Sequence, residues 1–253
     1  AKYPPGHPLL LAIGVLAGAP WLVSPIASGL SVFLIYLIGR RAYGWPTGLL
    51  AAGLALVSPF FIFLSGSYMA HATGLLFVLL FVWLFMRDER PRTAALAGGA
   101  IGFAFLRFAR APHERLRRYA AMLGAFVPFV VAWLGYNWAL TGSPLKNTME
   151  MWWAFDKVGF GPDHGPFGFY PVDGFYNTTR NLTELQAHLF GWPPYLTLLF
   201  VTLPFVLLRA RRQDWLFLAG FLSLVAGYAV WWADGIMFGP RFYFESIGFL
   251  LLL

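Results

Sequence analysis

Long runs of apolar residues, separated by short clusters of arginine, constrain this chain more than any other feature. Charged residues make up 11% of its 253 residues, whereas soluble domains carry about 25%. A membrane-spanning helix needs roughly 20 predominantly apolar residues, and runs near that length recur along the whole chain. The sequence therefore predicts an all-α integral membrane protein, built as a multi-spanning helix bundle with extracytoplasmic loops and juxtamembrane helices.

The apolar runs give the candidate spans. They cover residues 23–39, 46–64, 70–86, 119–138, 194–208 and 215–232, and a last run begins at about 243. A shorter run, 8–19, has a length that suits an interfacial or re-entrant helix better than a crossing. We expect one transmembrane domain over residues 1–253, with residues 1–22 forming a juxtamembrane segment on the outer surface.

The basic residues predict the orientation, because lysine and arginine collect in cytoplasmic loops. Thirteen of the 18 basic residues lie in four clusters, at 40–41, 87–92, 107–118 and 209–212. With these clusters in the cytoplasm, the N-terminal strip AKYPPGH faces the outside. The net charge of +7 comes from these clusters, so we expect no nucleic acid partner.

One region does not fit the alternation of sides. An even number of crossings is needed between the clusters at 87–92 and 107–118, but only the short run 94–106 is available. The sequence favours a second helix that is missing from this chain. The alternatives are a re-entrant segment, or one long helix over 94–118 with a different topology upstream.

The largest outer segment, residues 139–192, is rich in glycine, proline and aromatic residues. Loops beyond about 15 residues are usually functional or disordered, and the many aromatic residues argue against disorder. We expect a large extracytoplasmic loop with an amphipathic helix from about 175 to 190. Leu182, Leu185 and Leu189 would form its apolar face, which would lie on the membrane.

Polar residues that could bind a ligand also gather on the outer side. Arg241 and Glu245 stand four residues apart at the predicted start of the last helix, so they would share a face. Charges at a membrane boundary are functional candidates, although a structural ion pair is the alternative here. Cationic donors favour anions, and aromatic neighbours favour a sugar or an isoprenoid chain. The candidate substrate-binding residues are Lys2, Tyr3, His7, Tyr68, His71, Arg180, Arg241 and Glu245.

The outer loop offers weaker catalytic candidates. The stretch DKVGFGPDH contains Asp156, Asp163 and His164. Two carboxylates and one histidine would permit a divalent metal but are a weak metal signal. The chain has no cysteine, which excludes thiolate chemistry. It has no Gly-rich phosphate loop, HExxH or GxSxG motif, so nucleotide-driven transport is not supported.

Several stretches resemble the GT-C superfamily of membrane glycosyltransferases. KYPPGHPLLLA is followed by LIYLIGRRAYGWPTGLLAAGLALVSPFFIFLSGSYMAHATG, with a YPP strip, a basic pair that ends a span, and an SP-containing span in the family's order. YNWALTGSP, DKVGFGPDHG, NTTRNL, LFGWP and FGPRFYFE are similar to an uncharacterised bacterial branch. The chain is most similar to bacterial protein-mannosyltransferase and aminoarabinose-transferase members, which are glycosyltransferase family 39-like.

The resemblance implies a GT-C fold with its active site on the extracytoplasmic side of a bacterial inner membrane. It implies an inverting glycosyltransferase with a polyprenyl-phosphate-linked sugar as donor, an extracytoplasmic lipid, glycan or protein as acceptor, membrane lipids as surroundings, and no metal or cofactor. In the family, an acidic residue in the first outer loop is associated with catalysis, and we expect it to precede Ala1. Arg241 is the first choice for contact with the phosphate, followed by Lys2 and His7.

A non-catalytic membrane protein, such as a flippase for lipid-linked sugars, is the alternative function. An acidic residue shortly before AKYPPGH would favour the enzyme, and its absence would favour a carrier or a pseudoenzyme.

Overall fold

The computed structural model describes residues 6–87, 112–193 and 195–253, with the backbone alone at residue 87 and at residues 112–123. Within these ranges the chain is helical, and its extended segments make only isolated β-bridges. The α-helices are α1 (Gly6–Leu16), α2 (Val23–Tyr43), α3 (Trp45–Val57), α4 (Pro59–Ser65), α5 (His71–Arg87), α7 (Pro112–Thr141), α8 (Pro171–Phe190), α9 (Leu196–Val206), α10 (Arg212–Ala229) and α11 (Ile247–Leu252). Short 3₁₀ helices are η1 (Pro20–Leu22), η3 (Thr148–Met151) and η4 (Arg241–Ser246).

The predicted helical character is confirmed, and the number of membrane crossings stays a prediction. In the described ranges, one helix, Pro20–Tyr43, is by itself long and apolar enough to cross a membrane. The bent pair formed by α3 and α4 could be a second, broken crossing. Helices α1, α5 and α9 are apolar but shorter. The run 94–106 lies outside the described residues, whereas residues 112–118, expected in a basic loop, form the first turns of α7.

The predicted span over 46–64 is bent in its second half, and whether it crosses the membrane stays a prediction. Helices α3 and α4 meet at an angle of 66°. Ser58, between them, is extended with ψ of 115°, because the ring of Pro59 excludes the helical conformation from the preceding residue. The hydroxyl of Ser58 caps α4 by accepting a hydrogen bond from the amide of Phe61 at 3.2 Å. It also donates to the carbonyl oxygen of Leu189 in α8 at 2.5 Å.

Glycines let α2 and α3 pack closely. A Cβ atom on Gly39 would lie 2.8 Å from the Cα of Gly48, and one on Gly48 would lie 2.6 Å from the carbonyl oxygen of Tyr36. Small residues at helix contacts allow such close approach in membrane proteins, where apolar transfer from lipid gives little driving force. A larger side chain at Gly39 or Gly48 would therefore push the two helices apart.

The amphipathic helix α8 begins at Pro171, four residues before the predicted start. Pro171 occupies the first helical turn, and the Asp173 carboxylate accepts a hydrogen bond from the amide of Tyr170 at 2.9 Å. Gly191 ends the helix in the left-handed conformation, with φ of 66°. Leu185 and Leu189 are buried in the protein core, so this face packs on α4 and α10 instead of lying on lipid.

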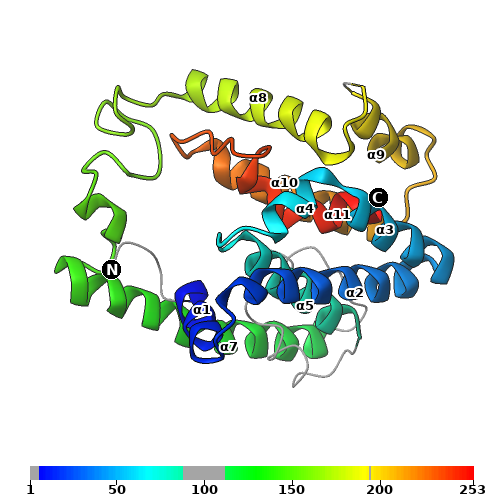
Figure 1. The fold of residues 1–253 in the computed structure, drawn as a ribbon, viewed down its shortest axis with the longest axis horizontal. Coiled ribbons are helices and arrows are strands. Elements are labelled where there is room, and N and C mark those ends of the chain that lie inside the picture. Colours follow the sequence, from blue (N-terminus) through cyan, green and yellow to red (C-terminus); the bar gives the residue numbers. More distant parts are fainter. Residues whose placement is uncertain (1–5, 88–111, 194) are drawn as a thin grey trace.

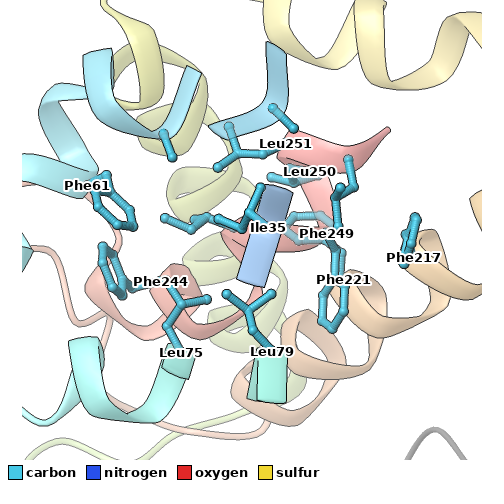
Figure 2. Packing of buried hydrophobic residues seen from close by; sticks show 14 of the residues in the cluster. Ile35, Phe61, Leu75, Leu79, Phe217, Phe221, Phe244, Phe249, Leu250 and Leu251 are labelled. Carbon is cyan, nitrogen blue, oxygen red and sulfur yellow. The ribbon is translucent and has the colours of Figure 1, made fainter. Parts of the chain in front are cut away.

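The C-terminal segment lies at the centre of the core. In Figure 1, α8 and α7 run along opposite edges, and α11 lies between them beside α10. All six residues of α11 are buried, and the helix contacts α2, α3 and α10. Figure 2 shows Phe249, Leu250 and Leu251 meeting side chains from α2, α5 and α10. Residues far apart in the sequence therefore depend on this segment for their packing.

The bridging role of Ser58 is testable. Replacing Ser58 with alanine removes the cap of α4 and leaves the carbonyl of Leu189 without its donor. We expect a loss of roughly 1–3 kcal/mol of stability, measured as a lower unfolding temperature in detergent. Ser223→Ala is the matched control, because the Ser223 hydroxyl bonds only to the carbonyl of Gly220 in its own helix. Equal unfolding temperatures for the two variants would contradict this account.

Candidate functional site

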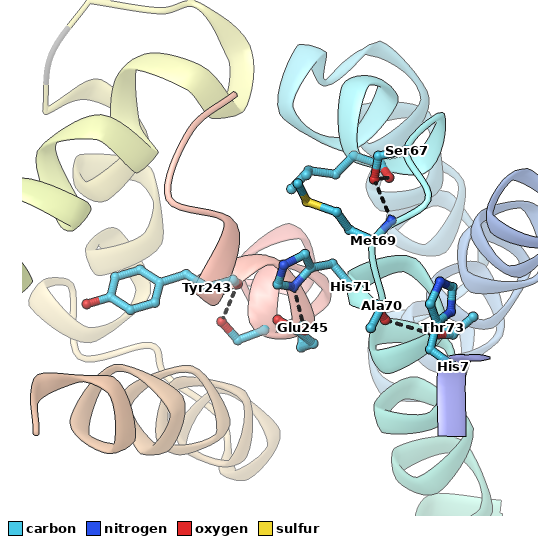
Figure 3. A network of polar contacts seen from close by, with 10 residues as sticks. His7, Ser67, Met69, Ala70, His71, Thr73, Tyr243 and Glu245 are labelled. Atoms are coloured by element: carbon cyan, nitrogen blue, oxygen red, sulfur yellow. Dashed lines mark hydrogen bonds and ion pairs between the residues drawn. The ribbon is translucent and has the colours of Figure 1, made fainter. Parts of the chain in front are cut away.

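A polar network connects α1 to the start of α5. The ring of His7 places Nε2 2.9 Å from the carbonyl oxygen of Tyr68 and Nδ1 3.1 Å from the hydroxyl of Thr73. Because a carbonyl oxygen only accepts, Nε2 must donate. The Thr73 hydroxyl also contacts the carbonyl oxygen of Ala70 at 2.8 Å. Figure 3 shows these groups beside His71, whose ring lies on the other side of the helix start.

His71 is held by a carboxylate from the other end of the chain. Its Nδ1 lies 2.8 Å from Oε1 of Glu245 in η4, and the two side chains are only 13% and 19% exposed. A Cβ atom on Gly74 would lie 2.9 Å from Cγ of Glu245. Glycine at position 74 therefore leaves the space that the Glu245 side chain occupies when it contacts His71.

Aromatic rings form the wall next to this pair. The ring of Phe242 stacks on Tyr228 of α10 with centroids 4.7 Å apart and planes 1° from parallel. The guanidinium of Arg241 lies over the Phe242 ring at 5.1 Å from its centroid, a cation–π arrangement. The ring of His71 lies 6.4 Å from that of Phe242. Tyr228, Arg241 and His71 thus gather around the Phe242 ring, and Glu245 joins them through His71.

Two polar atoms in this cluster retain bonding capacity. Nε of Arg241 and Oε2 of Glu245 are enclosed by protein and have no hydrogen-bond partner within the described ranges. The terminal nitrogen Nη1 of Arg241 lies 3.8 Å from the sulfur of Met237. Enclosed charged groups without partners are costly, so an anion near Arg241 and a hydroxyl donor near Glu245 would both stabilise the cluster.

The expectation that Arg241 and Glu245 share one face of the last helix is wrong. They lie in the 3₁₀ helix η4, and α11 begins only at Ile247. A 3₁₀ helix has three residues per turn, so positions i and i+3 are aligned, and positions i and i+4 are not. Phe242 and Glu245 therefore point in similar directions, which brings Glu245 to His71.

Two predicted site residues lie on more open surface. The guanidinium of Arg180 forms an ion pair with Asp234 at 3.0 Å, with 45% and 39% of the side chains exposed. The side chain of Tyr68 is exposed, although its carbonyl oxygen takes part in the His7 network. Lys2 and Tyr3 lie outside the described residues.

The three catalytic candidates of the outer loop do not form one cluster. Asp156 is buried, and its Oδ1 accepts a hydrogen bond from the indole N–H of Trp232 at 2.7 Å. Asp163 is exposed and pairs with Lys157 and with Nδ1 of His164, the latter at 3.0 Å. Hydrogen bonding from Lys157 holds the pKa of the Asp163 carboxyl below its usual value. Among the described residues, no group of three or more acidic or histidine side chains could hold a metal ion.

Sequence reasoning missed Phe242, Tyr228 and Gly74. Phe242 lies inside the quoted motif FGPRFYFE, between two residues that were singled out for their charge. Tyr228 belongs to an apolar run, where a tyrosine gives no separate signal. The requirement for glycine at position 74 arises only from the approach of Glu245, a residue 171 positions later.

Asp156 is expected to hold the loop together rather than to react. Asp156→Ala would leave the indole N–H of Trp232 without its acceptor, and we expect a loss of roughly 1–3 kcal/mol of stability. Asp163→Ala, at an exposed position of the same loop, should leave the unfolding temperature nearly unchanged. An Asp156 variant that keeps its unfolding temperature would contradict this structural role.

Comparison with known proteins gives one family match, which covers the first part of the chain. Residues 4–111 match the family model described as dolichyl-phosphate-mannose-protein mannosyltransferase. That range contains His7, Tyr68, His71 and Gly74. Searches of curated proteins and of solved structures found no match. The match over residues 4–111 confirms the resemblance of this chain to the GT-C superfamily of membrane glycosyltransferases.

Proposed function

We propose that this protein transfers a sugar from a polyprenyl-phosphate-linked donor to an acceptor on the extracytoplasmic side of a bacterial inner membrane. The family match supports a membrane glycosyltransferase of the GT-C type. The observation that carries the proposal further is the pair of enclosed, unpartnered atoms, Nε of Arg241 and Oε2 of Glu245, in one short 3₁₀ helix. A donor phosphate and an acceptor hydroxyl are the two groups that these atoms would bind.

Arg241 would bind the phosphate. During transfer the bond between the anomeric carbon and the phosphate oxygen breaks, and negative charge grows on the leaving phosphate. A fixed guanidinium at that position stabilises the developing charge, and an apolar wall strengthens the effect by excluding water. The guanidinium carbon of Arg241 lies 5.1 Å from the centroid of the Phe242 ring, and this cation–π contact holds the guanidinium in place. The aromatic surface of Phe242 and Tyr228 would also suit the face of the sugar ring.

Glu245 would orient the acceptor. Its Oε1 is occupied by His71 at 2.8 Å, which fixes the carboxylate and leaves Oε2 to accept a hydrogen bond from an incoming hydroxyl. Attack by that hydroxyl on the face opposite the phosphate would invert the anomeric carbon, with the proton passing to a carboxylate base. In this arrangement Glu245 holds the hydroxyl in place, and a second carboxylate takes the proton.

The proposed orientation agrees with the charges around this cluster. The basic residues at 40–41 lie in the last turn of α2, and the cluster at 209–212 ends at the first residue of α10. His71 lies at the start of α5 and Tyr228 at the far end of α10. The positive-inside tendency would place those clusters in the cytoplasm. His71 and Arg241 would then lie at the outer surface, where a lipid-linked sugar and an extracytoplasmic acceptor can meet.

Arg241→Gln tests the phosphate contact. We expect binding of polyprenyl phosphate to the protein in lipid nanodiscs to weaken by about 1.5–3 kcal/mol, the scale of a charge-assisted hydrogen bond, measured by native mass spectrometry or calorimetry. Arg180→Gln is the matched control, because Asp234 already pairs with that guanidinium. If the two variants bind polyprenyl phosphate equally well, Arg241 does not contact the phosphate and its role is structural. If the unmodified protein does not bind, the donor assignment fails.

Glu245→Gln should separate binding from transfer. Removing a negative charge near the donor phosphate should leave polyprenyl-phosphate binding unchanged or tighter. Transfer from a labelled donor should fall by about 10²-fold or more, because the acceptor hydroxyl loses its charged partner. Full transfer by this variant would contradict an acceptor role for Glu245. Donor binding and release across the membrane without any transfer would favour a carrier.

A further inference from the structure

A cavity lies on an apolar side of the molecule, and Arg241 is not among the residues that line it. It has a volume of about 360 Å³ and is formed where α2 passes the bend between α3 and α4. Its lining is mostly apolar, and the residues that form it are Pro25, Ser28, Gly29, Val32, Leu56, Phe61, Ile62, Ser65 and Gly66. The residues at its rim, Leu56 and Ile62, are more than half exposed. An apolar opening of this kind on a membrane-spanning helix faces lipid chains.

Two hydroxyl groups in this lining are unusual. The Oγ atoms of Ser28 and Ser65 are enclosed and find no hydrogen-bond partner in the described part of the chain. Serine in a helix ordinarily bonds to the carbonyl four residues earlier, and Ser31 in the same helix does so, to Ala27 at 2.8 Å. An enclosed hydroxyl without a partner destabilises the folded protein, because it has lost its hydrogen bonds to water. Both serines line the cavity.

The chemistry of the lining selects the occupant. The ligand must present apolar chain to Val32, Leu56 and Phe61, and must also carry hydrogen-bond acceptors for the two serine hydroxyls. An isoprenoid chain is purely hydrocarbon and offers no acceptor. The acyl chains of a glycerophospholipid are attached through ester carbonyls, which are acceptors at the border between the polar and apolar regions. Ser65 lies at such a border, because α4 ends there and a polar turn follows.

We infer that this cavity is a binding site for one diacyl glycerophospholipid of the bilayer, with Ser28 and Ser65 donating to its ester carbonyls. An acyl chain would run along Val32 toward Leu56. The bound lipid would fill the angle that Pro59 creates between α3 and α4, next to the turn that carries Tyr68 and His71. The inference does not depend on glycosyl transfer, because none of the residues that line this cavity belongs to the Arg241 cluster and its lipid is not the sugar donor.

Glycine positions allow a test by occlusion. A Cβ atom built on Gly29 meets no atom of the described chain within 4 Å, and the same holds for Gly53 in α3. Gly29 lines the cavity and Gly53 does not. We expect Gly29→Phe to lower retention of dioleoyl phosphatidylethanolamine by about tenfold or more, measured by native mass spectrometry on the whole membrane protein. Gly53→Phe, the matched control, should retain the lipid as the unmodified protein does.

A second arm tests the carbonyl contacts and does not rely on a bulky substitution. The unmodified protein should bind the diester lipid several-fold more tightly than the diether lipid with the same head group and chains. Ser28→Ala and Ser65→Ala should each weaken diester binding by about fivefold, the scale of one neutral hydrogen bond, and leave diether binding unchanged. The lipid-free variants should unfold at the same temperature as the unmodified protein or higher, because each loses an enclosed unpaired hydroxyl.

The outcomes are decisive in either direction. Equal lipid retention by Gly29→Phe and Gly53→Phe would overturn the site. Equal affinity for the diester and diether lipids would overturn the assigned contacts, and preferential retention of a polyprenol would replace the phospholipid with an isoprenoid. A Gly29→Phe variant that loses the phospholipid but still transfers sugar normally would support the lipid site, and it would also show that transfer does not need the bound lipid.

Discussion

The contact between His71 and Glu245 is the constraint on which the candidate site depends. It joins the first residue of α5 to η4 across 174 positions of sequence, with Nδ1 and Oε1 2.8 Å apart. The contact exists because α11, the helix after η4, is buried along its whole length among α2, α3 and α10. Because η4 runs directly into α11, the packing of α11 also constrains the position of η4. Arg241 and Phe242, the first residues of η4, are thereby set beside Tyr228 and His71.

Backbone features in the first half of the chain prepare this arrangement. Gly39 and Gly48 let α2 and α3 approach closely, and Pro59 turns α4 by 66° from α3. That turn creates the flank cavity on one side, and on the other it directs the following loop toward His71 and His7. Ser58 fixes the bend to α8 through the carbonyl of Leu189. The polar cluster around His71 and the cavity lined by Ser28 and Ser65 therefore both lie next to this bend.

The helical elements were predictable from the sequence, because a long apolar run in a membrane must satisfy its backbone hydrogen bonds internally, and an α-helix does so. The sequence also pointed to His71, Arg241 and Glu245, because charged groups next to apolar runs need a partner or a function. It could not predict how they pair. The expected alignment of Arg241 with Glu245 assumed an α-helix, and the 3₁₀ geometry of η4 instead sends Glu245 to His71. The bend at Ser58 could have been read from Pro59, whereas the burial of the leucines of α8 depends on tertiary packing.

The most direct test of this account is an experimental structure of the protein in nanodiscs with a bound polyprenyl-phosphate sugar analogue. The account predicts phosphate density within about 3 Å of the Arg241 guanidinium, the sugar against Phe242 and Tyr228, and the Glu245 carboxylate still held by His71. Phosphate density at another outer residue, such as Arg180, with Arg241 making no contact to the ligand, would contradict it.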